Sequence, residues 1–371
     1  MTPSILKDRL ALSLSLIPRR TIPKSPLTLH RAMSTTTSND LPASSIPIFR
    51  TLTEYRAWRN DAFRANKTVG FVPTMGALHD GHLSLVRRSL AENDLTVVSI
   101  FVNPAQFAPH EDLATYPRTL PHDLALLEAE KLELDAPDNT TRTPSAVFLP
   151  TVPEMYPSGI VQSVAEQKGT FVEVKGYSHQ MEGTTRSTFF RGVATVVTKL
   201  FNAIQPTNAY FGQKDIQQAL LLKRMARDLL LAHPEPQNLH IIRTARDAAD
   251  GLALSSRNAY LTPAGRQVAA TLRQALQAAE AAWIAGLSKA ECLTQARAVV
   301  DFRIVQAKAE GLGVVMVQDY IEMNDASTFE VLPDAATKAD ADLVILSGAL
   351  YVDKTRLIDN ILLGDTEDVL S

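Results

Sequence analysis

The chain has little that could serve as a covalent or metal-based framework, because its 371 residues include a single cysteine, Cys292. One thiol excludes an intrachain disulfide and any multi-cysteine metal site, and it suits a reducing compartment. A lone cysteine is more often a small buried side chain than a catalytic nucleophile. We therefore expect neither disulfide nor thiol chemistry.

Long apolar runs and a dominant charge are missing too. No segment reaches the roughly 20 apolar residues of a membrane-spanning helix, so no membrane protein is expected. The 37 Lys and Arg residues nearly balance 40 Asp and Glu residues, which leaves a net charge of −3 and no global positive field for nucleic acid. The remaining composition, 45% hydrophobic and 21% charged, is typical of a globular protein, and the length fits about two domains.

Residues 1–45 differ in composition from the rest of the chain. Only Asp8 and Asp40 are acidic there, amid many Ser and Thr residues, whereas the basic residues are Lys7, Arg9, Arg19, Arg20, Lys24 and Arg31. This balance resembles a mitochondrial presequence, and a disordered leader is the alternative. Met33 is also a candidate second start site. The sequence therefore leaves a cytoplasmic and a mitochondrial location open.

From Phe49 onward, apolar runs typical of buried strands alternate with amphipathic stretches typical of helices. The strand-like runs are 68–74, 95–102, 146–149, 208–211 and 239–243. The helical stretches are 83–93, 122–134, 190–204 and 215–231. This alternation predicts an α/β fold, with a doubly wound parallel sheet over residues 46–245.

After about residue 245 the pattern changes to two Ala-rich helical stretches and two strand-like runs. The helical stretches are 263–285 and 288–310, and the strand-like runs are 315–323 and 342–352. They predict a smaller α+β domain over residues 246–371. The junction between two domains is a favoured place for a ligand cleft. Residues 135–145, rich in Pro, Asn, Thr and Asp, are expected to be a surface loop.

The strongest local signal is FVPTMGALHDGHLSL, in which an expected strand and turn lead into a helix. His79 and His82, three residues apart at the helix start, can face one side beside unpaired N–H groups and the positive helix end. Gly76 and Gly81 would let the backbone approach a ligand closely. This arrangement suits a nucleotide phosphate. A pair of solvent-facing cap histidines is the alternative, and zinc lacks further ligands here.

The second signal is FVNPAQF, directly after an apolar strand. Asn103 and Gln106 follow the carboxyl end of that strand, where open parallel sheets bind ligands. Their amides offer donors and acceptors for hydroxyl, carboxylate or amine groups. An ordinary turn around Pro104 is the alternative.

The third signal, YFGQKDIQQ, lies at another strand-to-helix switch. Gly212 is expected to free the turn, and Lys214 brings a compact positive charge. Asp215 suits a helix cap, Mg²⁺ or a ribose hydroxyl. A cap alone accounts for the aspartate but not for the lysine.

The fourth signal, DGLALSSRN, lies at the domain junction, where two hydroxyl groups precede an arginine. Ser255, Ser256 and Arg257 together suit an anion clamp, with an ordinary Ser-rich turn as the alternative. No Walker A, GxGxxG or GxSxG motif occurs in its expected context. Nucleotide binding would therefore depend on the histidine pair.

These four blocks, in this order and spacing, resemble the pantoate–β-alanine ligase (pantothenate synthetase) family of the HxGH nucleotidyltransferase superfamily. The resemblance runs from about Ile48 to Asp359 and includes DLATYPRTLPHDL and EGTTRSTFFRGVATVVTKLFN. It implies a Rossmann-like fold and the ATP-dependent condensation of pantoate with β-alanine to pantothenate. The implied route passes through a pantoyl adenylate and releases AMP and diphosphate, with Mg²⁺. Members of the family are usually homodimers.

The resemblance also implies roles for individual residues. It places His79, His82 and Lys214 in catalysis, with His82 as proton donor, and it places Gln106, Asn103 and Gln218 on the acid and amine substrates. The ATP-binding positions would be Met75, Gly76, Ala77, Leu78, His79, Asp80, Gly81, His82, Gly212, Gln213, Lys214, Asp215, Ala245, Leu254, Ser255, Ser256 and Arg257. The last three would close over the triphosphate from a mobile second domain.

Two features depart from the family pattern. Phe189 stands where many members have histidine, so a polar contact is lost or replaced there. The segment TARDAADG is one residue longer than usual. Two other function classes remain: a simple adenylyltransferase, which would not need the amides of Asn103, Gln106 and Gln218, and an inactive binding protein that retains the fold.

Overall fold

The computed structural model describes residues 41–109, 111–134 and 141–370. Residues 1–40 of the expected leader and residues 135–140 of the expected 135–145 loop lie outside these residues. On either side of the second gap, β4 (Leu132–Glu133) and β5 (Thr141–Arg142), which falls within the expected loop, form a short antiparallel pair.

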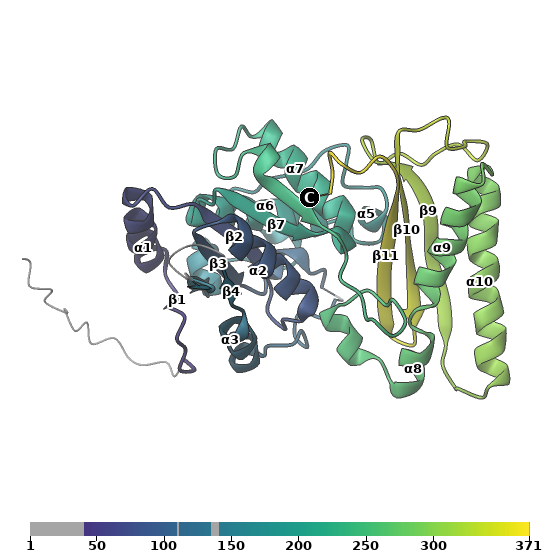
Figure 1. Cartoon of the computed structure of the whole chain (residues 1–371), viewed down its shortest axis with the longest axis horizontal. Coiled ribbons are helices and arrows are strands. Elements are labelled where there is room, and N and C mark those ends of the chain that lie inside the picture. Colours follow the sequence, from purple (N-terminus) through teal and green to yellow (C-terminus); the bar gives the residue numbers. More distant parts are fainter. Residues whose placement is uncertain (1–40, 110, 135–140, 371) are drawn as a thin grey trace, which may run out of the picture. The chain divides into compact units, whose positions relative to one another are not determined.

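A six-stranded parallel sheet confirms the predicted α/β fold (Figure 1). Its strand order is β1-β6-β3-β2-β7-β8, and every described pairing between neighbours is parallel. The strands are β1 (Ile48–Phe49), β2 (Val69–Thr74), β3 (Leu95–Ile100), β6 (Ala146–Phe148), β7 (Asn208–Gly212) and β8 (Leu239–Ile242). All but β1 fall on the predicted strand-like runs, which are apolar because helices cover both faces of the sheet.

Alternation along the strands divides the core into two hydrophobic clusters. Phe71 and Val97 belong to one cluster, whereas the next residues, Val72 and Val98, belong to the other. Successive side chains of a strand point to opposite faces. The first face is covered by α1 (Leu52–Arg64), α6 (Phe189–Ile204) and α7 (Ile216–Asp228), and the second by α2 (Asp80–Glu92) and α3 (Leu120–Ala129). Two short helices, α4 (Val152–Met155) and α5 (Glu182–Thr185), precede α6.

The predicted α+β part contains a three-stranded antiparallel sheet of order β11-β10-β9. Its strands are β9 (Met316–Asp325), β10 (Leu343–Val352) and β11 (Thr355–Gly364), packed against α9 (Thr271–Ile284) and α10 (Lys289–Ala309). The sequence did not predict β11. It follows β10 through a two-residue turn, Asp353–Lys354, which lacks the Asn-Gly or Asp-Gly signal of a tight hairpin.

The predicted helix over 263–285 is wrong in one respect, because the structure divides it into α8 (Pro263–Val268) and α9. The Thr271 hydroxyl donates to the Val268 carbonyl over 2.6 Å. A side chain that takes a backbone carbonyl in this way competes with the helical hydrogen-bond pattern. The break therefore follows from one local contact.

The C-terminal elements have a hydrophobic cluster of their own, formed by residues between Leu252 and Leu363. The chain from Pro42 onward nevertheless packs as one compact unit. The domain boundary at residue 245 therefore stays a prediction. No described helix combines the length and apolar character needed to cross a membrane.

The strand order places four loops at one edge of the parallel sheet. β2 lies between β3 and β7, and β8 follows β7, so the chain leaves β2 in opposite directions along the sheet. Such a switch point opens a crevice at the carboxyl ends of the strands. The segments after β2, β3, β7 and β8 carry the four sequence signals.

Candidate active site

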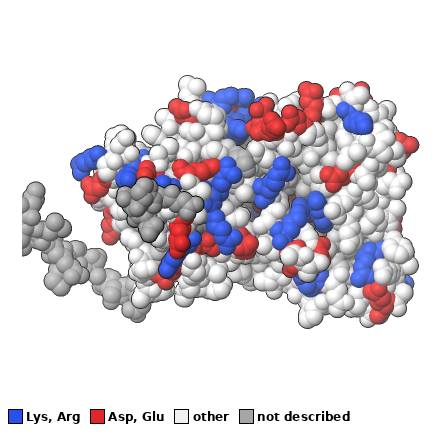
Figure 2. Space-filling model, viewed as in Figure 1, with Lys and Arg blue, Asp and Glu red and all other residues white. Residues whose placement is uncertain are grey.

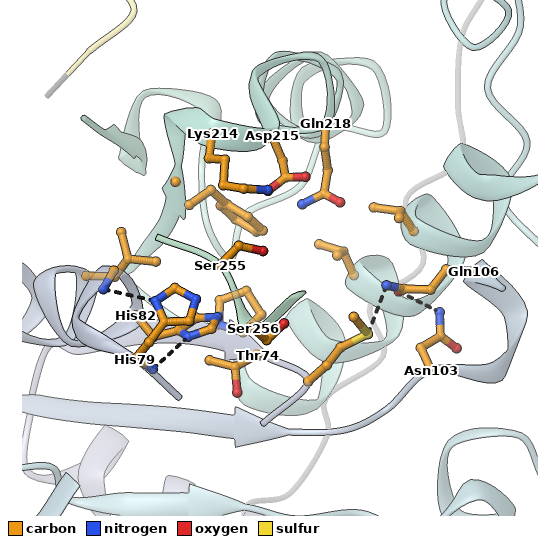
Figure 3. A pocket seen from close by; sticks show the side chains of 18 of the residues that line it. Thr74, His79, His82, Asn103, Gln106, Lys214, Asp215, Gln218, Ser255 and Ser256 are labelled. Carbon is orange, nitrogen blue, oxygen red and sulfur yellow. Dashed lines mark hydrogen bonds and ion pairs between the residues drawn. The ribbon is translucent and has the colours of Figure 1, made fainter. Parts of the chain in front are cut away.

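A cavity of about 240 Å³ lies at this edge of the sheet (Figure 3). It brings together residues from all four sequence signals. The predicted site residues that line it are Met75, His79, Gly81, His82, Asn103, Gln106, Gly212, Lys214, Asp215, Gln218, Ala245, Leu254, Ser255, Ser256 and Arg257. The convergence expected from the sequence is therefore present in the structure.

Other predicted ATP-site residues do not line the cavity: Gly76, Ala77, Leu78, Asp80 and Gln213. Asp80 is exposed and pairs with Arg87 at 2.8 Å. The buried side chain of Gln213 donates to Asn360 of β11. The roles predicted for these five residues on ATP therefore stay predictions.

The two histidines lie next to each other at the start of α2, with ring centroids 4.1 Å apart and planes tilted by 40°. Nδ1 of His79 accepts from the Gly81 N–H over 3.1 Å, and Nδ1 of His82 accepts from the His79 N–H over 3.4 Å. Because Nδ1 is an acceptor in both neutral rings, the proton of each lies on Nε2. The cavity is therefore lined by two Nε2–H donors.

Gly81 is required by the position of the His79 ring. A Cβ at residue 81 would lie 2.8 Å from Cε1 and 2.9 Å from Nδ1 of His79. Any larger residue would displace the ring from its cap position. The glycine between the two histidines thus makes room for a side chain, in addition to any close approach of a ligand.

Burial keeps both rings uncharged in the free protein. Burial, followed by the charge of Lys214, lowers the pKa of His79 to about 4. Burial, His79 and Lys214 together lower the pKa of His82 to about 3. Near neutral pH the pair therefore offers hydrogen-bond donors without adding positive charge beside Lys214. A bound phosphate would favour the protonated rings and raise both pKa values.

The turn before the histidines has an unusual backbone that Asp123 holds in place. Gly76 has φ of 82° and Ala77 has φ of 50°, which alanine rarely adopts. The Asp123 carboxylate accepts from the Ala77 N–H over 3.1 Å and from the Leu78 N–H over 2.9 Å. Sequence reasoning missed this aspartate. The feature that could have identified it is the presence of an acidic residue next to apolar residues of the expected helix, where Leu124 and Leu127 are buried.

Asn103 acts by orienting Gln106. Its Oδ1 accepts from the Tyr156 hydroxyl over 2.6 Å, and its Nδ2 donates to Gln106 Oε1 over 3.1 Å. Gln106 Nε2 then contacts Met75 Sδ at 3.0 Å, a weak acceptor (Figure 3). A ligand oxygen would be a better partner. The buried asparagine thus presents the glutamine amide to the cavity.

Lys214 and Asp215 extend from the 3₁₀ turn η3 (Gln213–Asp215) toward the cavity. The ammonium and carboxylate are 3.7 Å apart, a long contact. Asp215 begins α7 but makes no capping hydrogen bond with its side chain, so its carboxylate is available to a ligand. Gly212 has φ of −86°, an ordinary value. The expected need for glycine flexibility in this turn is therefore wrong.

The junction segment lines the opposite side of the cavity. Ser255 caps a 3₁₀ turn, η5 (Ser256–Tyr260), by accepting from the Arg257 N–H. The Arg257 guanidinium pairs with Asp112, with a shortest contact of 3.1 Å. A second cavity of about 820 Å³ adjoins the first and shares Lys214, Asp215, Ser255 and Arg257. An anion entering from that side would compete with Asp112 for the arginine.

Phe189 makes a cation–π contact with Arg186. The Arg186 guanidinium lies 3.8 Å from the centre of the Phe189 ring and pairs with Glu111 at 2.6 Å. Burial alone would raise the pKa of Glu111, but the hydrogen bonds and charge of Arg186 hold it below its usual value. Both Arg186 and Phe189 line the cavity. The histidine expected from the family pattern is thus replaced by an aromatic platform for an arginine.

Figure 2 shows several Lys and Arg side chains close together in the middle of one face of the molecule, with acidic side chains among and around them. The chain as a whole carries a net charge of −3. Local positive charge on a weakly negative protein favours a small anionic ligand over nucleic acid.

Asp123→Asn should destabilise the protein. An Asn amide would place a second donor against the Ala77 or Leu78 N–H in a buried site. The expected loss in the free energy of unfolding is about 1–3 kcal/mol, measured by urea denaturation. Asp61→Asn is the control, because the Asp61–Arg64 pair is exposed and its loss should cost under about 0.5 kcal/mol. Equal stabilities of the two variants would contradict the role of Asp123.

The neutral histidines predict an acid-dependent loss of stability. The folded-state pKa of His79, about 4, is below the ordinary value of 6.5. Its contribution is therefore complete above pH 6.5 and is lost as the pH falls toward 4. His79→Asn, which can still cap α2, should flatten the pH dependence of the unfolding free energy by up to about one proton over this range.

Urea denaturation at several pH values measures this slope. His122→Asn removes an exposed imidazole and serves as the control. A slope in His79→Asn identical to that of the wild type would show that His79 titrates normally in the folded protein.

Comparisons with known proteins agree with this geometry. The profile of the pantoate–β-alanine ligase family matches residues 47–362. The pantoate–β-alanine ligase of Saccharomyces cerevisiae is 43% identical over 85% of this chain and 99% of its own. The pantothenate synthetase of Herpetosiphon aurantiacus is 44% identical with the same coverage.

Solved structures with the same names share the fold. Pantothenate synthetase from Thermus thermophilus matches with a TM-score of 0.67 and 38% identity, over 85% of this chain and 99% of that one. The enzyme from Francisella tularensis, described as complexed with β-γ ATP and β-alanine, matches with a TM-score of 0.61 and 29% identity, over 86% and 98%. The chain therefore belongs to the pantoate–β-alanine ligase family, and it is an enzyme of that class.

Proposed function

We propose that this enzyme joins pantoate to β-alanine in two steps, through a pantoyl adenylate, with AMP and diphosphate as the other products. The observation that carries the proposal is that one cavity holds two kinds of group. Imidazole and ammonium donors suited to phosphates lie there together with side-chain amides suited to a hydroxy acid and an amine. A nucleotide and a small hydroxy acid would meet there in one enclosed space. The ATP and β-alanine named for the Francisella tularensis structure support both ligands.

In the first step, a carboxylate oxygen of pantoate attacks the α-phosphorus of ATP, and the bond to diphosphate breaks. Two anions must be held together while negative charge grows on the leaving group. The Lys214 ammonium and the Nε2–H groups of His79 and His82 are suited to this task by charge and by position. The uncharged state of the two rings in the free protein keeps three cations from repelling one another before ATP binds.

In the second step, the amine of β-alanine attacks the acyl carbon, and AMP leaves. Gln106, held by Asn103, would orient both substrates. Gln218 also lines the cavity, and within the described part of the chain its amide has no hydrogen-bond partner. It is therefore free to bind the hydroxyl or carboxylate groups of pantoate.

Mg²⁺ fits this scheme as an ion that arrives with ATP. The described residues contain no group of three or more His, Cys, Asp and Glu side chains that could hold a metal. Asp215 is the acidic side chain lining the first cavity, and it is 46% exposed. One carboxylate together with phosphate oxygens is a usual Mg²⁺ environment, although Asp215 equally suits a ribose hydroxyl. When bound, the ion would neutralise phosphate charge.

Lys214→Ala or His82→Ala should reduce ATP–diphosphate exchange in the presence of pantoate by about 100-fold or more, because each removes a group directed at the phosphates. Lys223→Ala is the matched control: Lys223 lies on α7, and its ammonium donates to the Asp368 carbonyl. The control should exchange at close to the wild-type rate. Near-normal exchange in Lys214→Ala would remove that residue from its role.

The same assay distinguishes the function classes. Exchange that requires pantoate, followed by AMP and pantothenate when β-alanine is added, supports the two-step ligase. Exchange that occurs with a phosphate-bearing acceptor but not with pantoate would favour an adenylyltransferase. No exchange in folded protein supplied with Mg²⁺ would indicate an inactive homologue. The homodimer expected from the family stays a proposal that mass measurement in solution tests.

The composition of residues 1–45 supports a separate proposal on the cellular compartment of the enzyme. A fluorescent protein fused to residues 1–45 should enter mitochondria if the basic residues form a presequence. A fusion that starts at Met33 lacks the six basic residues before it and should stay in the cytoplasm. A cytoplasmic location of both fusions would support a leader without a targeting role.

A further inference from the structure

Two neighbouring residues of β11 connect the C-terminal sheet to the segments that form the cavity. Asp359 and Asn360 are 5% and 2% exposed. The Asp359 carboxylate makes two contacts to Arg246, at 2.7 and 2.9 Å, and Arg246 begins the segment that leads to Ser255. Asn360 contacts η3, which carries Lys214. One strand therefore holds both sides of the phosphate site.

All the polar groups of the Asn360 side chain are used on this one turn. Its Nδ2 donates to the carbonyls of Gln213 and Lys214, each over 2.9 Å. Its Oδ1 accepts from Gln213 Nε2 over 3.2 Å. Buried hydrogen bonds of this kind fix a backbone, because breaking them leaves unsatisfied polar groups.

Lys214 depends on this support because its ammonium has little polar anchoring of its own. Its ion partner among the described residues, Asp215, lies 3.7 Å away, and the Lys214 side chain is 20% exposed. The backbone position therefore determines where the ammonium reaches.

We propose that Asn360 is a positioning residue for Lys214. Its carboxamide fixes the η3 backbone, so that the ammonium meets the phosphates of ATP at the distance the first step needs. This inference rests on the proposed function, in which Lys214 acts on those phosphates. It assigns a role in the reaction to Asn360 of β11, although its side chain does not line the first cavity.

Asn324 of β9 is the control that distinguishes a positioning role of Asn360 from a structural role alone. It is 1% exposed, and its Nδ2 donates to the Phe329 carbonyl over 2.9 Å. It belongs to the same sheet and lines neither of the two cavities described above. Asn324→Ala and Asn360→Ala both remove a buried amide that binds backbone, but only the second is expected to disturb Lys214.

The full-length enzyme is assayed by ATP–diphosphate exchange in the presence of pantoate, with melting temperature as the check on folding. Asn360→Ala should lower exchange by about 10- to 100-fold, the range expected when a catalytic group moves by about 1 Å. Asn324→Ala loses one hydrogen bond where Asn360→Ala loses three, so it should lower the melting temperature by less and leave exchange within about two-fold of the wild type. Asn360→Ser, which keeps a polar group in the space, replaces the alanine variant if that variant does not fold.

A double-mutant cycle tests whether the effect passes through Lys214. In the Lys214→Ala background, Asn360→Ala should change the residual exchange by less than about two-fold, because the group it positions is gone. The same loss in both backgrounds would overturn the proposal, as would equal exchange by Asn360→Ala and Asn324→Ala. A wild-type enzyme without pantoate-dependent exchange would instead overturn the proposed function on which the inference rests.

Discussion

The parallel pairing of β2 with β3 on one side and β7 on the other is the constraint on which the site depends. In register, Thr74 pairs with Ile100, and Phe71 pairs with Ala209. The strands therefore end at one edge, and the segments that follow them meet there however far apart they are in sequence. Parallel strands need long crossovers, which explains why the four site segments are separated by helices. Each segment contributes a different chemistry: imidazoles, amides, a lysine–aspartate turn and a hydroxyl–arginine turn.

The pattern of strands and helices was predictable because it has a local cause. Strands covered on both faces are continuous apolar runs, and their observed bounds differ from the predicted ones by one or two residues. The elements that sequence reasoning missed have no such local cause. β1 is an edge strand of only two residues, α1 packs next to it, and β11 follows a turn that lacks a hairpin signal. The break between α8 and α9 depends on a single hydroxyl.

The same division applies to the site. The histidine pair, the amides and the lysine–aspartate turn could be identified because their residue types occur at strand ends. Their physical state could not, because it depends on what surrounds them in space. The pKa values of His79 and His82 are lowered by burial, and the rings share an Nε2–H form because backbone N–H groups occupy both Nδ1 atoms. Asp123 and Asn360 are further examples, since each contacts backbone at least 45 residues away.

The contacts of β11 also bear on how the cavity can open. A lid formed by the whole C-terminal part would have to separate Asp359 from Arg246 and Asn360 from η3, and both β11 side chains are buried. The contacts on the far side are weaker: Arg257 meets Asp112 through longer hydrogen bonds at partly exposed positions. Long contacts also join Tyr116 to Ser256 and Tyr260 to the Thr115 carbonyl, at 3.4 and 3.3 Å. Opening should therefore begin at the 112–116 and 255–260 segments and pivot about β11. With that pivot, Lys214 would stay with β11 while Arg257 separates from Asp112.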